Sequence, residues 1–433
     1  MFKNKRVNFY IVLTVFSLIG QVAWVVENMY FNVFIYNMFS ASANQISLMV
    51  SLSAVTATLT TLLIGALSDK LGKRKVFICG GYIIWGITIL SFALIRKDVI
   101  SAIFPTVASA SSIGVSLVII MDCVMTFFGS SANDACFNAW LTESVSSEDR
   151  GKMEGINSMM PLVAILVVFG GFMSLKPNLA SSWTIIYTTI GVVVTLIGVL
   201  GCFLIEEKAV KIEENSSYFK NIFYGFRPTV VKENKDLYLN LIIFAVFGIS
   251  IQIFMPYLII YYQVSLKMEN YVLIMAPAII LASVFTFFYG RLYDKLGFEN
   301  SAIPSMLILI LGYILLFIFK GVALVFVGSL LMMCGYLSGM AVFGAVIRDK
   351  IPENKAGMFQ GLRIICQVLI PGVIGPWIGS LVLRDAQKIT NGDGTESFIP
   401  NENIYLASLI VAVIVVGLLI LFRYLSNKKK ENR

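Results

Sequence analysis

The sequence predicts an all-α membrane protein with twelve transmembrane helices in two pseudo-symmetric six-helix bundles. Three observations predict it: the hydropathy, twelve apolar segments separated by polar loops, and an internal repeat. Of 433 residues, 58% are hydrophobic and only 13% are charged, whereas a soluble protein carries about 25% charged residues. Charged residues this few cannot cover a water-facing surface. Most of the exterior must therefore face lipid. A soluble enzyme is therefore excluded.

Each apolar segment is long enough to cross a bilayer, which takes about 20 residues. Charged or Pro/Gly-rich breaks separate the segments. The expected spans are approximately 9–38, 45–67, 76–95, 109–141, 155–175, 182–205, 237–264, 270–290, 302–319, 322–346, 357–383 and 403–424. An even count places both termini on the same side of the membrane.

The distribution of basic residues predicts the orientation. If the N-terminus is inside, the inner segments hold 25 Lys or Arg residues and the outer loops hold 7, as the positive-inside rule requires. The basic start runs into about thirty apolar residues, too long for the core of a cleaved signal peptide. We therefore expect a multi-pass protein of the cytoplasmic membrane with both termini in the cytoplasm.

The longest polar stretch divides the chain into an N-terminal bundle (1–205), a cytoplasmic linker (206–236) and a C-terminal bundle (237–433). Within the linker, the sequence YFKNIFYGF (218–226) has the aromatic and basic character of an interfacial helix. A solvated linker with incidental aromatic residues is the alternative.

An internal repeat supports this division. GALSDKLGKRK (65–75) follows span two, and GRLYDKLG (290–297) follows span eight, 225 residues later. RGKMEG (150–155) before span five similarly matches AGMFQG (356–361) before span eleven. Parallel repeats of six spans are typical of transporters whose substrate site lies between the halves.

The composition excludes several kinds of chemistry. Histidine is absent, which excludes Ser-His-Asp triads, HExxH zinc sites and histidine-ligated haem. No G-x-x-x-x-G-K-[ST] loop for ATP occurs. The six cysteines lie in apolar segments without a CxxC pair, so we expect reduced core residues. The +8 net charge sits in short loops, so nucleic acid is not an expected partner. We expect no enzymatic activity, cofactor or metal.

The duplicated loop motif resembles that of the major facilitator superfamily, G-x-x-x-D-[RK]-x-G-[RK]-[RK] between spans two and three. The first copy matches at every position, through Gly65, Asp69, Lys70, Gly72, Lys73 and Arg74. The second copy retains Gly290, Asp294, Lys295 and Gly297 but lacks the basic tail. The resemblance covers essentially the whole chain and implies the major facilitator fold with transport by alternating access.

The resemblance also implies that these loops hold one face shut in one conformation. The Asp69 carboxylate is expected to accept hydrogen bonds from a helix N-terminus or from a cation across the bundle. The family's arginine at the inner end of span four has no clear counterpart, and Arg150 or Arg363 could replace it. Arg363 could instead snorkel to water, or pair with Asp69, Glu143 or Glu154. The gating residues implied are Gly65, Asp69, Gly72, Arg74, Glu143, Asp294 and Arg363.

Within the superfamily, the chain loosely resembles the sugar porters of the glycoside-pentoside-hexuronide and sucrose-transporter-like groups. This resemblance rests on the polar, aromatic first span, on NDACFNAWLTE (133–143) and on RGKMEG. Cation symporters of the first group carry carboxylates in span two, whereas span two here has none before Asp69. A melibiose-type sodium site is therefore not carried over.

Two carboxylates lie well inside spans, away from the span ends: Glu27 in the outer half of span one and Asp122 near the middle of span four. A charge inside the bilayer is costly and is kept where it faces the bundle interior or a water-filled path. In the absence of histidine, these are the expected carriers of a coupling proton, or of another cation such as sodium. The alternative for each is a structural hydrogen bond to a neighbouring helix.

Polar residues follow helical spacing around these carboxylates. Thr126 and Asn133 share a stripe with Asp122 on span four; Gln21, Trp24, Asn28 and Asn32 form another on span one. Amides exchange hydrogen bonds with hydroxyls, and an aromatic ring stacks on the C–H face of a sugar. Such stripes suit a sugar, but also nucleosides or small amphipathic drugs. Trp24 could instead be an interfacial or core residue.

The second half offers fewer polar residues. Span seven carries Gln252 and Tyr257 beside Pro256, which should interrupt the helix. Span eleven carries Arg363 and Gln367 one turn apart, then PGVIGPWIG (371–379), which contains Trp377 and predicts a bent helix. The complete predicted substrate-binding set is Gln21, Trp24, Asn28, Asn32, Thr126, Asn133, Gln252, Tyr257, Gln367 and Trp377.

The sequence therefore predicts a monomeric secondary active transporter. We expect a proton-coupled symporter of a sugar or glycoside, with Glu27 and Asp122 as the coupling groups. The expected partners are a small-molecule substrate, a coupling ion and the lipid bilayer. A proton-driven exporter of drugs or metabolites and a non-transporting membrane sensor are the alternatives.

Overall fold

The computed structural model describes residues 5–105, 107–145, 149–206, 224–268, 270–351 and 356–431. Within these residues, 12 helices are long and apolar enough to cross a membrane, which confirms the predicted all-α fold class. They are Val7–Phe39, Ala43–Leu71, Lys75–Phe92, Ala110–Ser144, Gly155–Phe172, Ala180–Leu204, Lys235–Ser265, Val272–Leu296, Phe298–Ile318, Val322–Lys350, Gly361–Val382 and Asn403–Leu425.

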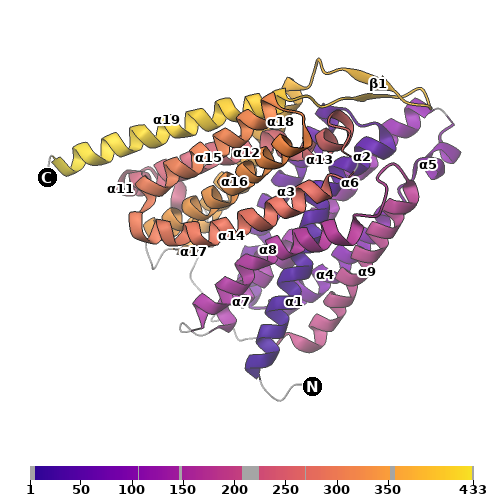
Figure 1. Cartoon of the computed structure of the whole chain (residues 1–433). Helices are drawn as coiled ribbons and strands as arrows, with labels where there is room; N and C mark the ends of the chain where they lie inside the picture. The colour runs from indigo at the N-terminus through magenta and orange to yellow at the C-terminus, as the bar shows by residue number, and fades with distance from the viewer. Residues whose placement is uncertain are drawn as a thin grey trace. The chain divides into compact units, whose positions relative to one another are not determined.

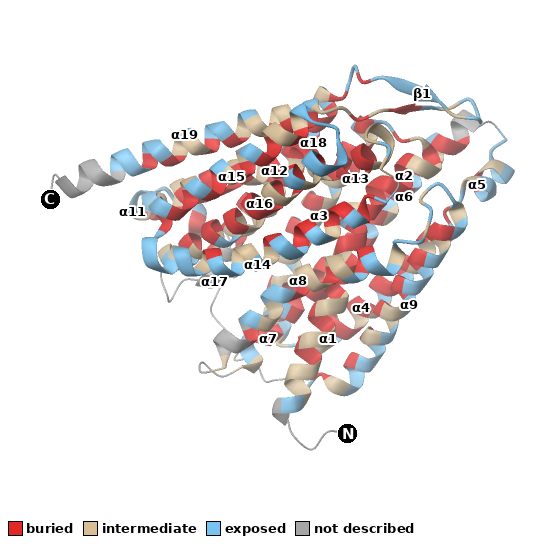
Figure 2. Cartoon of the chain, viewed as in Figure 1, coloured by how far each residue is buried: buried red, intermediate tan, exposed pale blue. Residues whose placement is uncertain are grey.

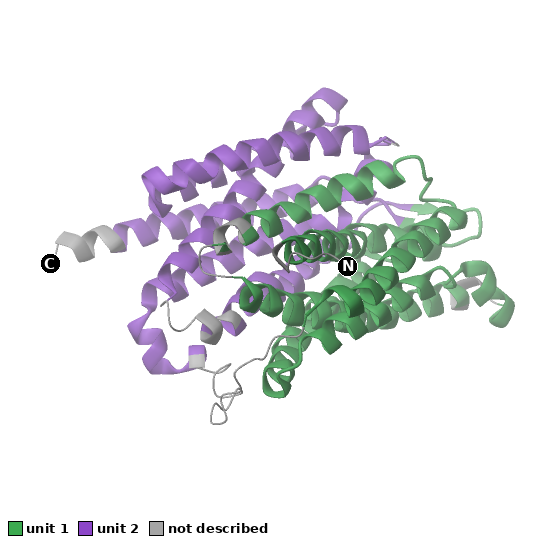
Figure 3. Cartoon of the chain, turned by 90° about the horizontal axis from the view of Figure 1, so that it is seen from below, with its two compact units in different colours: residues 1–218, 389–397 green, residues 219–388, 398–433 purple. Residues whose placement is uncertain are grey.

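The chain forms two compact units, coloured separately in Figure 3. Unit 1 comprises Met1–Tyr218 and Ile389–Ser397, and unit 2 comprises Phe219–Lys388 and Phe398–Arg433. The sequence interpretation placed all of 237–433 in one bundle, whereas residues 389–397 pack within unit 1. Most of the YFKNIFYGF segment predicted to form an interfacial helix lies outside the described residues.

Unit 1 consists mainly of helices that follow one another along the chain (Figure 1). They are α1 (Lys5–Val25), η1 (Val26–Tyr30), α2 (Phe31–Phe39), α3 (Ala43–Leu71), α4 (Lys75–Phe92), α5 (Lys97–Ile103), α6 (Val107–Gly129), η2 (Ser130–Phe137), α7 (Asn138–Ser144), α8 (Arg150–Phe172) and α9 (Ala180–Leu204). Because η1 and η2 continue their flanking α-helices, span one is built from α1, η1 and α2, and span four from α6, η2 and α7.

Unit 2 is likewise built mainly of consecutive helices, and the chain between its last two helices forms a short hairpin whose residues 389–397 belong to unit 1. The helices of unit 2 are η3 (Tyr224–Phe226), α11 (Pro228–Glu233), α12 (Lys235–Phe254), η4 (Met255–Tyr257), α13 (Leu258–Ile260), η5 (Tyr261–Ser265), α14 (Val272–Leu296), α15 (Phe298–Ile318), α16 (Val322–Lys350), α17 (Ala356–Ile364), η7 (Ile365–Leu369), α18 (Ile370–Val382) and α19 (Asn403–Glu431). The strands β1 (Lys388–Thr390) and β2 (Glu396–Phe398), between α18 and α19, form a two-stranded sheet.

The spans expose apolar rather than polar side chains, as a lipid-facing surface requires. On α3, the exposed Leu48, Leu52, Leu59 and Leu63 recur at steps of four and seven residues, along one face of the helix. Exposed positions likewise alternate with buried ones along α9 and α19 (Figure 2). The buried faces carry the aromatic core, including Trp85 in unit 1.

Short local signals delimit α3. At its start, the Ser42 hydroxyl accepts a hydrogen bond from the Gln45 backbone N–H at 3.3 Å, and the Gln45 side chain accepts from the Ser42 backbone N–H at 2.9 Å. This reciprocal capping box satisfies two donors that the helix leaves free. At its end, Gly72 adopts φ 62°, a left-handed conformation that glycine tolerates without strain.

Glycine allows α4 and α9 to pack closely. A Cβ atom added at Gly86 of α4 would lie 2.2 Å from the Thr195 hydroxyl oxygen and 2.7 Å from the Gly191 carbonyl oxygen of α9. Where lipid replaces water, such close backbone contact is a main source of helix association.

The hairpin tip packs on unit 1. The Asn391 amide donates hydrogen bonds to the hydroxyls of Ser40 at 3.0 Å and Ser397 at 2.9 Å. The Asp393 carboxylate pairs with Lys97 and accepts a 2.6 Å hydrogen bond from the Thr395 hydroxyl. These hydrogen bonds hold the pKa of Asp393 well below its usual range.

We predict that Gly86→Ala destabilises unit 1 by about 1–3 kcal/mol, because the new methyl group overlaps backbone and side-chain atoms of α9. The measurement is the melting temperature of the purified protein. Gly80→Ala on the same helix is the matched control, because a Cβ there would meet nothing within 4 Å. Equal melting temperatures for the two variants would contradict this packing.

We predict that Asp393→Asn speeds hydrogen exchange of the hairpin-tip amides about threefold to tenfold, the range expected for the loss of a hydrogen bond. Because folding lowers the pKa of Asp393, its stabilising contribution is present above the ordinary aspartate pKa and is lost as the pH falls through the lowered value. Exchange measured across pH tests this, with the exposed Asp385→Asn as control. Unchanged exchange in Asp393→Asn would refute the role of this contact.

Candidate functional site

Glu27 lies in η1, a five-residue π-helical segment whose turn is wider than that of an α-helix, and is buried inside unit 1. Its Oε1 atom accepts hydrogen bonds from the Ser53 hydroxyl of α3 at 2.7 Å and from the Thr126 hydroxyl of α6 at 2.8 Å. One carboxylate oxygen therefore joins spans one, two and four. Thr126, predicted to bind substrate, contacts the predicted coupling group.

Asp122 lies one helical turn before Thr126 on α6 and is 2% exposed. Within the described part of the chain, neither Oδ1 of Asp122 nor Oε2 of Glu27 has a hydrogen-bond partner, and neither residue forms an ion pair. Acceptors buried without partners are costly. Two carboxyl groups that act on each other electrostatically without a paired cation are suited to binding a proton or a small cation.

The asparagine side chains of the span-one stripe form hydrogen bonds within their own helix. The Asn28 amide N–H donates to the Trp24 carbonyl at 2.8 Å, and the Asn32 amide N–H donates to the Asn28 carbonyl at 3.0 Å. These bonds use donors and leave the buried Oδ1 atom of Asn32 without a hydrogen-bond partner. Such an oxygen can accept a hydrogen bond from a hydroxyl group. Gln21 is half-buried on this stripe.

Asn133 forms hydrogen bonds with other residues of unit 1. In η2, its Oδ1 accepts a hydrogen bond from the Tyr82 hydroxyl at 2.9 Å, and its amide donates to Asp134 at 3.2 Å. A Cβ atom added at Gly20 would lie 2.6 Å from this oxygen, so the residue is tightly packed. These contacts support a structural role for Asn133.

Trp24 packs against Trp85 of α4, with ring centroids 5.0 Å apart and planes inclined by 46°. Trp85 is fully buried, whereas Trp24 is half-buried. Trp24 thus belongs to the edge of the aromatic core, and part of its surface remains available for stacking.

In unit 2, the predicted residues divide between buried and exposed positions. Tyr257 is fully buried and donates to the Pro376 carbonyl at 3.4 Å. Gln252 is half-buried on α12. It lies against α18, since a Cβ atom added at Gly375 of that helix would lie 2.4 Å from the Gln252 Cβ. Trp377 is 56% exposed, because two positions along the helix from Gly375 its side chain points away from α12.

Arg363 and Gln367 form a local pair. The Arg363 Nε donates to the Gln367 side-chain oxygen at 3.2 Å, and both side chains are half-buried. Gln367 lies in the π-helical segment η7 (Ile365–Leu369), which ends two residues before Pro371. Proline has no N–H, so Pro371 cannot donate the helical hydrogen bond to the Gln367 carbonyl. A π-helical segment therefore directly precedes α18, the helix that holds the prolines of span eleven.

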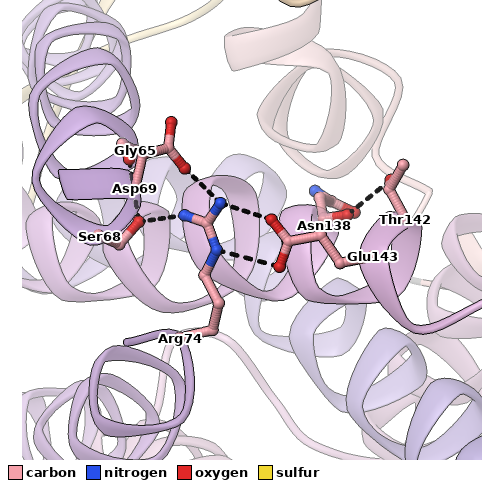
Figure 4. Close-up of polar contacts among 7 residues, drawn as sticks. All are labelled: Gly65, Ser68, Asp69, Arg74, Asn138, Thr142 and Glu143. Carbon is pink, nitrogen blue, oxygen red and sulfur yellow. Dashed lines mark hydrogen bonds and ion pairs between the residues drawn. The ribbon is translucent and has the colours of Figure 1, made fainter. Parts of the chain in front are cut away.

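Arg74 supplies the cation for the motif loop (Figure 4). It contacts Ser68 and pairs with Asp69 on α3, and its guanidinium also donates to the Glu143 carboxylate of α7 at 2.7 and 3.4 Å. The Arg74 side chain is only 5% exposed. Burial lowers the pKa of Arg74, but its hydrogen bonds to Glu143 and the charge of Asp69 outweigh this and raise it.

This network corrects the expected gate. Asp69 and Glu143 both pair with Arg74, which comes from the motif itself. The left-handed turn at Gly72 reverses the chain and returns Arg74 beside Asp69. Gly65 takes part through its carbonyl, which accepts from the Ser68 hydroxyl at 2.9 Å. The side chains of Arg150 and Glu154 lie outside the described residues.

The second copy of the motif is arranged differently. Asp294 is exposed, and the described residues include no ion pair to it. Its neighbour Tyr293 donates instead to Asp349 of α16 at 2.6 Å. The lost basic tail therefore coincides with a lost ion-pair network.

Sequence reasoning missed Ser53 and the wide turns. Four π-helical segments occur in the described chain, and three of them hold predicted residues: Glu27 and Asn28 in η1, Asn133 in η2, and Gln367 in η7. Such turns are frequent at functional sites. Serine in a span is common enough that Ser53 carried no distinguishing signal. Among described residues, no group of three or more Cys, Asp or Glu could hold a metal ion.

The fold and these sites define a twelve-span helical membrane protein, and comparison with known proteins specifies the family. The family model of the Major Facilitator Superfamily matches residues 10–376 of this sequence. The chain therefore belongs to the Major Facilitator Superfamily, whose members are multi-pass membrane transporters of small molecules. A search of curated proteins finds no match.

Solved structures show the same fold. The nucleoside transporter NupG is 14% identical with a TM-score of 0.69, and the alignment covers 96% of this chain and 99% of that one. A D-xylose-proton symporter is 12% identical with a TM-score of 0.73, covering 96% and 97%. The xylose transporter XylE from E. coli, in a partially occluded inward-open conformation, is 13% identical with a TM-score of 0.68, covering 96% and 98%.

We predict that Arg74→Ala lowers stability by about 1–3 kcal/mol, because it leaves Asp69 and Glu143 close together without their shared cation. The partial exposure of both carboxylates keeps the loss below that of a fully buried pair. Thermal unfolding measures the effect, with the exposed neighbour Lys73→Ala as control. Equal losses in the two variants would refute the network.

Proposed function

We propose that this protein is a proton-coupled symporter of a sugar or glycoside that works by alternating access. The observation that carries this proposal is the pair of buried carboxyl groups, Glu27 and Asp122, inside unit 1 without a paired lysine or arginine among the described residues. Such groups inside a membrane protein are characteristic of ion and proton pathways.

The coupling argument is electrostatic. If both carboxyl groups are ionised, they repel each other in a medium of low dielectric constant. A bound proton relieves this repulsion, so loading and unloading a proton changes which arrangement of the helices is favoured. A transporter that reaches its two states with different protonation can use a proton gradient to drive its substrate.

The substrate argument rests on span one. The unpartnered Oδ1 of Asn32 can accept a hydroxyl hydrogen, and the half-buried Trp24 offers a ring surface for the C–H face of a sugar. Nucleosides share the sugar ring and form a second group of candidate substrates. The likeness to a xylose-proton symporter and to a nucleoside transporter is compatible with both groups, although at this identity it concerns the fold.

Several further assignments belong to the proposal. The basic loops favour a protein of the cytoplasmic membrane with both termini inside. We also propose that the monomer is the transporting unit. In the gate, Arg74, Asp69 and Glu143 stabilise one conformation on the cytoplasmic side.

We predict that proteoliposomes holding the purified protein accumulate a sugar or nucleoside when an inward proton gradient is imposed. Glu27→Gln and Asp122→Asn should each reduce gradient-driven accumulation at least tenfold. Exchange of labelled for unlabelled substrate should persist, because it needs no net proton movement. The measurement is radiolabelled uptake over a panel of mono- and disaccharides and nucleosides, with the exposed Asp98→Asn as control.

Each other outcome identifies a rival. Uptake without dependence on the proton gradient would refute proton coupling. Binding without flux would favour a membrane sensor. If no panel member moves and cells lacking the protein accumulate drugs or metabolites, the exporter is the correct function.

A further inference from the structure

The hydroxyl groups around Glu27 form a closed triangle. Oε1 of Glu27 lies 2.7 Å from the Ser53 hydroxyl oxygen and 2.8 Å from that of Thr126, and the two hydroxyl oxygens lie 2.9 Å apart. All three separations fall within the range of O–H···O hydrogen bonds. Each oxygen therefore contacts both of the others.

The number of hydrogen atoms decides which protonation state this triangle accommodates. Three contacts of hydrogen-bond length need three hydrogens, one in each contact. The serine and threonine hydroxyls supply one each, and an ionised carboxylate supplies none. With Glu27 ionised, both hydroxyls donate to Oε1, and the hydroxyl oxygens of Ser53 and Thr126 face each other at 2.9 Å with no hydrogen between them.

We propose that Glu27 carries a proton in this conformation, and that Ser53 and Thr126 complete a cyclic hydrogen-bond triad that holds it. The carboxyl O–H of Glu27 donates to one hydroxyl, that hydroxyl donates to the other, and the second donates back to Oε1. Either direction around the ring satisfies all three contacts. This inference rests on the proposed proton coupling and assigns Ser53 as a positioning residue of the proton site.

The triad gives the proton a mechanical effect. Its three members come from η1, α3 and α6, so the ring ties spans one, two and four together at one depth. When the proton leaves to water, the carboxylate takes both hydroxyl hydrogens, and the contact between Ser53 and Thr126 loses its hydrogen bond. The approach of α3 to α6 therefore weakens. Deprotonation thus favours separation of these two helices.

The groups around the triad are consistent with one bound proton. Those that act electrostatically on Glu27 are Asp122 and Cys123 on α6 and Asp134 on η2. Each is an acid, so any of them in its ionised form repels a second negative charge at Glu27. On α3, the contact is the neutral Ser53 hydroxyl.

Infrared difference spectroscopy of the purified full-length chain, titrated with pH in the absence of substrate, tests this inference. We expect the carbonyl band of a protonated carboxylic acid at neutral pH, and we expect Glu27→Gln to abolish it. Ser53→Ala should move the band to higher frequency, because the carboxyl group loses a hydrogen-bond partner. Ser53→Thr keeps the hydroxyl and should restore the wild-type frequency.

Ser47→Ala is the matched control, because Ser47 is a buried serine of the same helix outside the triad; its band should coincide with that of the wild type. The absence at neutral pH of a carboxylic-acid band that Glu27→Gln removes would overturn the proposal. So would a band that Ser53→Ala leaves unmoved, or one that sodium ions remove at constant pH. Since the measurement needs no substrate, its failure is distinguishable from failure to transport sugars.

Discussion

The structure depends on one constraint: a carboxyl group in the middle of an apolar helix bundle must find hydrogen bonds inside the protein, because the bilayer supplies none. Glu27 meets it through hydroxyls from two other spans, so this residue joins three spans of unit 1. Asp122, one turn from Thr126, adds a second carboxyl group, whose Oδ1 has no hydrogen-bond partner among the described residues. The residue that satisfies this constraint is also the one that we propose carries the coupling proton.

Close helix packing and the predicted polar sites depend on different local features of the spans. Glycine positions such as Gly86 let helices approach until backbone atoms touch, which suits a bundle without the hydrophobic effect between its members. Four of the predicted functional residues, Glu27, Asn28, Asn133 and Gln367, lie in the π-helical segments η1, η2 and η7.

The motif loop shows how local conformation produces a long-range contact. The left-handed conformation of Gly72 reverses the chain after α3, and the reversal places Arg74 beside Asp69 and within reach of Glu143 on α7. One buried guanidinium then holds two carboxylates from different spans. In the second half, where Phe298 and Glu299 replace the basic tail, Asp294 remains exposed. Among the described residues, the ion-pair network of the first motif copy therefore has no counterpart around Asp294.

The sequence alone determined the class of fold, since twelve apolar segments and a duplicated loop motif are properties of composition and order. It also identified Glu27 and Asp122, because a carboxylate inside an apolar span stands out without any knowledge of contacts. Only the tertiary structure decided their partners. Ser53 is 26 residues from Glu27 and Thr126 is 99, and no periodicity within one helix specifies which neighbour faces it. The role of Arg74, the structural use of Asn133 and the outward direction of Trp377 likewise depend on how helices rotate against one another, which side-chain packing decides.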